Sequence, residues 1–188
     1  MNSADRMSSL IKDVLSFSSL KRQTDFVPLD LNGVLDTVVS DLDLLITQKH
    51  ATIEVGPLPT IEAIPLQMTQ LFYNLVNNSL KFAKEDEPCQ ITISCRVVPD
   101  QEHRSSFVRS GRYYEIIAKD NGIGFNMDHS EQIFGLFKRL NNKQFYSGSG
   151  IGLSMCRKVV ENHGGEIYAR GEDNHGAEFF IYLPEKQV

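Results

Sequence analysis

The sequence predicts an α+β fold: a two-layer sandwich in which a mixed β-sheet is backed by about three helices and preceded by one helix of a bundle. Runs rich in β-branched and aromatic residues recur along the chain after residue 50. Amphipathic segments with helical periodicity alternate with these runs. An apolar helical stripe near the start stands apart from both, with no strand-like run beside it.

The first helical segment carries four apolar residues at spacings of three, four and three, namely Met7, Leu10, Val14 and Phe17. This spacing is typical of a helix that packs against other helices. A polar stretch that ends at Pro28 interrupts the pattern. We therefore expect a bundle helix at 1–24 and a separate domain at 25–188.

The other elements are expected in a fixed order along the chain. A second helix begins after Asp30 or Asn32 and runs to about Leu45. Strand-like runs lie at 51–55, 90–98, 113–119, 166–169 and 177–183. Further helices are predicted at 65–83, near 129–140 and at 152–163. The sum is one sheet with helices against it.

Composition narrows the class of protein. With 188 residues, 41% of them hydrophobic, the chain can bury one good core. No apolar stretch is long enough to span a bilayer and the N-terminus does not resemble a signal peptide, so we expect a cytoplasmic chain without direct membrane contact. The net charge of -5 argues against a nucleic-acid partner. The cysteines have no metal-binding spacing and fit a reducing compartment.

A row of polar residues lies along the helix predicted at 65–83. Helical spacing places Asn74, Asn78 and Lys81 on one face. Mg²⁺ prefers hard oxygen ligands and takes several of them from phosphates and water, so one amide oxygen can suffice on the protein. A lysine acts as a point charge on phosphate. The alternative is that these side chains simply face solvent.

The first glycine cluster, at 120–124, follows the strand-like run at 113–119. Asp120 lies where the strand ends and the turn begins. An ionised carboxylate only accepts hydrogen bonds, so it would accept one from the amino group of adenine and face an unfavourable carbonyl in guanine. The alternative is an aspartate that only stabilises the turn.

The second cluster, at 148–153, opens the helix at 152–163. Glycines there let backbone N–H groups approach an anion at a helix N-terminus. Upstream, Lys138 or Arg139 could reach a phosphate. The polar segment at 141–147 has the character of a mobile lid over a nucleotide.

Four segments together resemble the catalytic and ATP-binding domain of bacterial sensor histidine kinases, in the GHKL ATPase superfamily. They are NLVNNSLK at 74–81, DNGIGF at 120–125, IFGLFKRL at 133–140 and GSGIGL at 148–153, in the order of the family's N, first glycine, F and second glycine boxes. The stretch at 146–169 is similar to the phytochrome-like subgroup. The segment at 6–11 looks like the second helix of the dimerisation and phosphotransfer hairpin.

The resemblance implies the GHKL (Bergerat) form of the sandwich, ATP and Mg²⁺ as ligands, and a role for each matching residue. Asn78 would be the Mg²⁺ ligand, with Asn74 and Lys81 near the phosphates. Asp120 would anchor adenine, with Gly122 and Gly124 lining the base. Arg139 would assist phosphoryl transfer, so Asn78, Lys81 and Arg139 are the predicted catalytic residues. The wider nucleotide-binding set adds Phe125, Lys138, Ser147, Gly148, Ser149, Gly150, Ile151, Gly152 and Leu153.

The chain departs from the family pattern at several positions. Ser79 stands where alanine is usual, and Ser149 where threonine is frequent. The last glycine box has Ala177 in place of a hydroxyl residue. Glu178 beside it would be unfavourable near phosphate unless strand alternation turns it outward. Ala63 and Ile64 stand where the family often has Gly-Asp.

The resemblance also implies partners. None of the five histidines fits the phosphoacceptor role, so the acceptor helix is expected on a segment missing from this chain. The full-length protein would be a homodimer that relays the phosphoryl group to the receiver domain of a response regulator. Two alternatives stay open: a degenerate nucleotide-binding interaction module without phosphotransfer, and another GHKL ATPase such as a kinase of the anti-sigma type.

Overall fold

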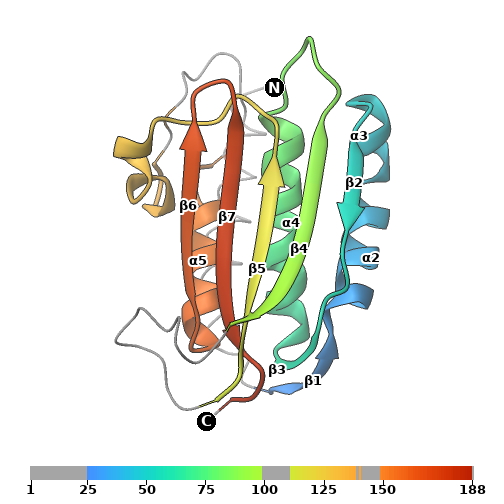
Figure 1. Ribbon diagram of the computed structural model, residues 1–188, viewed down its shortest axis with the longest axis vertical. Coiled ribbons are helices and arrows are strands. Elements are labelled where there is room, and N and C mark those ends of the chain that lie inside the picture. The colour runs from blue at the N-terminus through green and yellow to red at the C-terminus, as the bar shows by residue number, and fades with distance from the viewer. Residues whose placement is uncertain (1–24, 99–110, 139, 141–148, 188) are drawn as a thin grey trace.

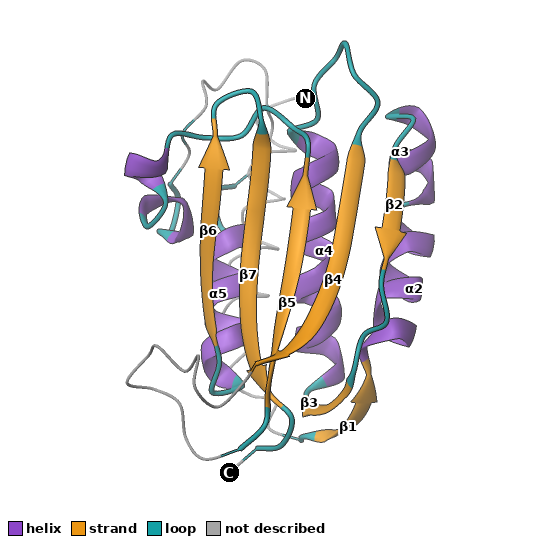
Figure 2. Cartoon of the chain, viewed as in Figure 1, coloured by secondary structure: helices purple, strands orange, loops and turns teal. Residues whose placement is uncertain are grey.

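A computed structural model describes residues 25–98, 111–138, 140 and 149–187. Its main sheet has five strands in the order β2-β4-β5-β7-β6. The helices lie together on one face of this sheet, as Figures 1 and 2 show. The strands are β2 (Thr52–Val55), β4 (Gln90–Val98), β5 (Tyr113–Asp120), β6 (Glu166–Glu172) and β7 (Gly176–Pro184).

The sheet is mixed, as predicted. β2 pairs with β4 in parallel, whereas the β4–β5, β5–β7 and β6–β7 pairs are antiparallel. β5 and β7 occupy the middle, and most of their residues are buried. Asp120, the last residue of β5, pairs with Ile91 on β4 and with Ala177 on β7. The register therefore places this carboxylate at one end of the sheet's centre.

Three longer helices cover the sheet: α2 (Leu31–Asp41), α4 (Pro65–Lys81) and α5 (Gly152–Asn162). The Asp30 side chain accepts a hydrogen bond from the Asn32 N–H and caps α2. Pro65 opens α4, where its missing N–H costs no helical hydrogen bond. The core between helices and sheet includes Met68, Leu71, Phe72, Ile93, Ile116 and Val159.

Several predicted elements differ in the structure. The predicted second helix breaks at Leu42, with φ −99° and ψ 5°, into α2 and the short α3 (Asp43–Gln48). Two short strands, β1 (Val27–Asp30) and β3 (Thr60–Ala63), form a separate two-stranded sheet that the sequence did not indicate. Ala63, one of the departures from the family pattern, ends β3.

The helix predicted near 129–140 is wrong. Two 3-10 turns stand in its place, η3 (Met127–His129) and η4 (Gln132–Phe134). Gly135 is extended after η4, and Phe137 has a left-handed φ of 59°, so the backbone cannot continue as a helix. Ile133 and Phe134 are still buried, which explains the apolar spacing that suggested a helix.

The predicted α+β sandwich is otherwise confirmed. The bundle helix at 1–24 lies outside the described residues, so the predicted boundary between two units stays a prediction. Within the described ranges, none of the helices is both long and apolar enough to cross a membrane.

Candidate functional site

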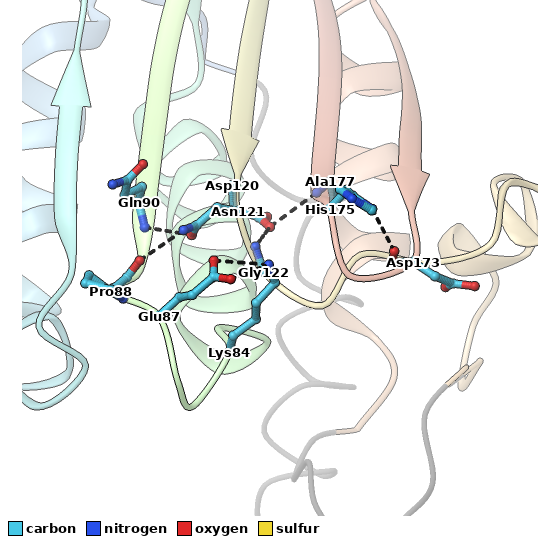
Figure 3. A network of polar contacts seen from close by, with 10 residues as sticks. All are labelled: Lys84, Glu87, Pro88, Gln90, Asp120, Asn121, Gly122, Asp173, His175 and Ala177. Atoms are coloured by element: carbon cyan, nitrogen blue, oxygen red, sulfur yellow. Dashed lines mark hydrogen bonds and ion pairs between the residues drawn. The ribbon is translucent and has the colours of Figure 1, made fainter.

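Asp120 is the centre of one end of the site. The residue is 8% exposed at the carboxyl end of β5. Its Oδ1 accepts hydrogen bonds from the backbone N–H of Gly122 at 2.9 Å and of Ala177 at 3.3 Å, as Figure 3 shows. Its Oδ2 accepts one from the Ser79 hydroxyl at 3.0 Å. Three donors, from three different elements, thus hold one carboxylate.

Two effects act on the pKa of the Asp120 carboxyl in opposite directions. Burial raises the pKa of Asp120 above its ordinary value because the charged form loses hydration, while the bonds from Gly122, Ser79 and Ala177 act in the opposite direction. A carboxylate has about four lone-pair positions, so three donors leave acceptor capacity for a ligand N–H. This largely buried carboxylate can therefore recognise a hydrogen-bond donor.

Asn121 fixes the turn that carries Asp120. Its Nδ2 donates to the Pro88 carbonyl at 3.0 Å, and its Oδ1 accepts from the Gln90 N–H at 2.8 Å (Figure 3). These bonds tie the end of β5 to the start of β4. Asp120 also stabilises its own turn through Gly122, as the alternative interpretation of the sequence predicts. This does not compete with a binding role, which stays a prediction.

Gly124 joins the first glycine cluster to the β6–β7 hairpin. It has a left-handed φ of 62°, and a Cβ at this position would lie 1.9 Å from the Glu172 carbonyl oxygen. The neighbouring Ile123 donates its N–H to Phe82 and accepts from the Asn174 N–H. In the structure, Gly124 allows two backbone segments to pack closely. Its contact with a base, like that of Gly122, stays a prediction.

The predicted polar face of α4 is present. Asn74, Asn78 and Lys81 are all half-buried, whereas Leu71 and Leu75 on the same helix are buried in the core. Phe82, directly after α4, is half-buried, and the Lys81 ammonium lies 4.5 Å from its ring centroid. The face is therefore neither core nor fully solvated.

Asn74 connects α4 to the second glycine cluster. Its Nδ2 donates to the Gln70 carbonyl at 2.8 Å, which leaves Oδ1 on the side of α5. A Cβ added to Gly152, the first residue of α5, would lie 3.0 Å from this Oδ1. Glycine at 152 thus lets the polar face of α4 and the start of α5 lie side by side.

The start of α5 forms the other end of the site. Ile151 precedes it without a side-chain cap, and its first turn has no acidic residue. The first N–H groups of an uncapped helix lack helical partners and attract anions. Ile151 is buried and Leu153 packs against the core, so both hold the helix in place. Ser149 and Gly150 are half-buried just before the helix.

The remaining predicted residues divide into two groups. Phe125 packs against the core beside Gly171, and Lys138 is exposed. Arg139, Ser147 and Gly148 and the predicted lid at 141–147 lie outside the described residues, so their roles stay predictions.

Two contributors to the site were missed from the sequence. Ser79 was treated as a mild departure, yet it donates to Asp120, and Ala177 contributes its N–H. No sequence signal pairs residue 177 with residue 120, because that pairing depends on the β5–β7 register. Glu178 points outward, as alternation allowed, and its carboxylate meets Lys119 at 2.7 Å.

The chain that brings β5, α4 and the start of α5 together in this way matches a known protein family. The model described as histidine kinase-, DNA gyrase B- and HSP90-like ATPase matches residues 63–187. The chain belongs to this family, and the resemblance stated from the sequence is confirmed.

The similar proteins are sensory kinases and phytochromes. The chain is 34% identical over 179 residues to cyanobacterial phytochrome A of Nostoc sp., covering 95% of this chain and 22% of that protein. It is 32% identical over 186 residues to the adaptive-response sensory kinase SasA of Prochlorococcus marinus, covering 96% and 47%. Among solved structures, full-length ShkA in complex with AMPPNP has a TM-score of 0.75 and 26% identity, covering 99% of this chain and 37% of that one. The chain spans less than half of each.

Proposed function

We propose that this chain is the ATP-binding catalytic domain of a two-component sensor histidine kinase, which transfers the γ-phosphoryl group of ATP to a histidine on another segment. The observation that carries the proposal is the pair of unlike groups at one end of the fold. A buried carboxylate with spare acceptor capacity lies at the end of β5, and at the start of α5 the first N–H groups receive no side-chain cap bond from Ile151. Family membership supports ATP as the ligand.

Each end has a separate task in this mechanism. Asp120 accepts a hydrogen bond from the amino group of adenine and rejects the carbonyl of guanine. The N–H groups at the start of α5 bind phosphate oxygens, and Lys81 adds a point charge. Phosphoryl transfer then depends on positioning and on neutralising the charge of the transferred group, for which we propose Lys81 and Arg139.

Asn78 fits a magnesium ligand. Among the described residues, no side-chain hydrogen bond is recorded for its amide, which is half-buried beside Asn74. No group of three or more His, Cys, Asp or Glu in the described ranges could hold a metal alone. Mg²⁺ here would therefore be held by the Asn78 oxygen together with phosphate oxygens and water. When bound, it neutralises phosphate charge.

We further propose that the acceptor histidine lies on the dimerisation hairpin, of which residues 1–24 form the second helix, and that a response regulator then receives the phosphoryl group. His163 is completely buried, which excludes it as an acceptor. The free thiols Cys89, Cys95 and Cys156 suit a cytoplasmic location, where ATP is available. A homodimer would bring the hairpin of one or the other subunit to the nucleotide.

Calorimetry with ATP and Mg²⁺ tests the binding step. We expect Asp120→Asn to weaken ATP binding about a hundredfold, because its amide N–H would face the amino group of adenine. Glu178→Gln is the matched control, since it makes the same chemical change on the outer face of the neighbouring strand. Equal ATP affinity in wild type and Asp120→Asn would refute the proposed binding mode.

Phosphotransfer is tested with the same chain and a separately expressed hairpin that carries an acceptor histidine. With ATP labelled at the γ-phosphate, we expect acid-labile label on the hairpin and none on this chain. Normal ATP binding without any label transfer would favour the degenerate interaction module instead.

A further inference from the structure

Ser79 lies inside the site and has no role in the mechanism above. It is on α4, one residue after Asn78, and is 5% exposed. Its hydroxyl has two acceptors within reach: the Leu75 carbonyl at 3.2 Å and Asp120 Oδ2 at 3.0 Å. A hydroxyl has one proton, and a charged acceptor forms the stronger bond. While Asp120 is ionised, the proton therefore points to the carboxylate.

The other two donors to Asp120 differ from Ser79 in kind. Gly122 and Ala177 both donate backbone N–H groups to Oδ1, and neither N–H can be turned away. Ser79 supplies the side-chain hydroxyl donor and bonds to Oδ2. Ala177 has no hydroxyl of its own to offer from the facing strand. The carboxylate is one rigid plane, so Gly122 and Ala177 fix its orientation through Oδ1, and Ser79 adds the only side-chain donor among these three, at Oδ2.

Charge near this carboxylate is sparse. The groups that oppose the effect of burial on the pKa of Asp120 are all hydrogen-bond donors, with no cation among them in the described ranges. On the β4 side the neighbouring titratable group is Cys89, whose pKa is raised to about 11 by burial and by Asp120, so it stays a neutral thiol. On the β7 side Ala177 carries no titratable group. If one of these hydrogen bonds to Asp120 is lost, no cation in the described ranges compensates for it.

We propose that Ser79 is a positioning residue for adenine recognition: its hydroxyl donates to Asp120 Oδ2 and favours the charged form of the carboxylate, which accepts a hydrogen bond from the 6-amino group of the base. The inference rests on the proposed function, because it assumes that Asp120 binds adenine. It assigns specificity to a residue that faces the carboxylate from α4. When Asp120 takes up a proton, the Ser79 hydroxyl turns back to the Leu75 carbonyl and the site loses its preference for a donor.

The test compares ATP with purine riboside triphosphate, which lacks the 6-amino group, on the full chain. In Ser79→Ala we expect ATP affinity to fall about tenfold at pH 6 and less at pH 8. Without the Ser79 hydroxyl, the Asp120 carboxylate takes up a proton at a higher pH than in wild type, so the loss is greater at the lower pH. Affinity for purine riboside triphosphate should change less than about twofold. Alanine is small and favours helix, so α4 should remain folded, which circular dichroism checks.

Thr69→Ala is the matched control. Thr69 is on the same helix, and its hydroxyl donates to the carbonyl four residues earlier, as that of Ser79 can, but it does not touch Asp120. This variant should bind both nucleotides as wild type does. Equal losses for both nucleotides in Ser79→Ala, or an unchanged ATP affinity at every pH, would overturn the inference.

The two proposals can fail separately. If the wild-type chain does not distinguish ATP from purine riboside triphosphate, the adenine-binding role of Asp120 fails. If the wild type distinguishes them and Ser79→Ala does so equally well, the proposed function stands and only the role of Ser79 is lost.

Discussion

The two ends of the site are built in opposite ways. At the Asp120 end, backbone and side-chain donors from α4, the β5 turn and β7 already occupy one buried carboxylate. At the α5 end, Gly152 starts a helix without a side-chain cap, and nearby residues such as Lys138 are exposed. The first end is held in place without a ligand and keeps acceptor capacity for one, whereas the second is a helix start whose first N–H groups attract an anion.

This difference teaches where substitutions should affect stability and where they should affect binding. A base is rigid and is recognised by one or two hydrogen bonds, which need a fixed carboxylate. Phosphates are flexible and highly charged, so a cluster of N–H groups and cations can bind them with less strict geometry. Changes that disturb the close backbone packing at the Asp120 end should therefore affect the fold first, and changes at the α5 end should affect binding first.

The largest expected effect is at Gly124. Gly124→Ala should lower the free energy of unfolding by more than about 3 kcal/mol, because the new Cβ would overlap a backbone carbonyl and the φ is left-handed. Urea denaturation followed by circular dichroism measures it. Gly33→Ala in α2 is the control. Among the described residues, nothing lies within 4 Å of a Cβ added at Gly33, and alanine should stabilise the helix by up to about 1 kcal/mol. Similar stabilities for the two variants would contradict the comparison.

Gly152→Ala should have the opposite character. Among the described residues, its Cβ would meet the tip of the Asn74 side chain alone, so the free energy of unfolding should change by less than about 1 kcal/mol. ATP affinity should nevertheless fall about tenfold, because Asn74 moves and a methyl group enters the phosphate end. Affinity for adenosine, measured in the same titration, should not change. A parallel loss for adenosine would show that the two ends are not independent.

His163 links the end of α5 to the start of α4, at the opposite end of both helices from the candidate site. Its Nε2 accepts from the Ile64 N–H at 3.0 Å, just before α4, and its Nδ1 donates to the Val159 carbonyl at 2.7 Å in α5. Burial lowers the pKa of His163 below its ordinary value of 6.5, although Val159 opposes this. The unfolded chain therefore binds the proton more readily, and stability is full above pH 6.5 and is lost as the pH falls below it.

The variant His163→Gln tests this linkage. At pH 7.5 it should be less stable than wild type by about 1 to 2 kcal/mol, because a buried hydrogen bond is lost. Between pH 7.5 and 5.5, wild type should lose about 1 kcal/mol more than the variant. Comparing the two slopes removes the contribution of other groups, including Asp120. Identical slopes in urea titrations would rule out a neutral, buried His163.

The smallest expected effect is on the outer face of the sheet. Lys119→Ala removes the ion pair with Glu178, whose partners are both partly exposed. Surface pairs contribute less than about 1 kcal/mol, so stability should barely change. ATP affinity should equal that of wild type, because both side chains face away from the site. A measurable loss of binding would mean that Glu178 acts on the phosphates after all.

Periodicity predicted the regular elements well and the irregular ones poorly. The strands at 90–98 and 113–119 and the helix from Pro65 were placed almost to the residue, because alternation and capping are local signals. The helix predicted near 129–140 is wrong. Its buried residues Ile133 and Phe134 suggest helical spacing, whereas the backbone at Gly135 and Phe137 is not helical. Strands β1 and β3 were missed because each is four residues long and is paired only with the other.

The sequence by itself determined the family and predicted the two ends of the candidate site, since the four boxes lie in contiguous segments whose order can be read directly. Only the tertiary structure decided what holds Asp120. Ser79 and Ala177 meet its carboxylate through the packing of α4 and the register of β5 against β7, which join residues far apart in the chain. Such contacts leave no periodic or local pattern, because the geometry that makes them exists only after the layers have packed.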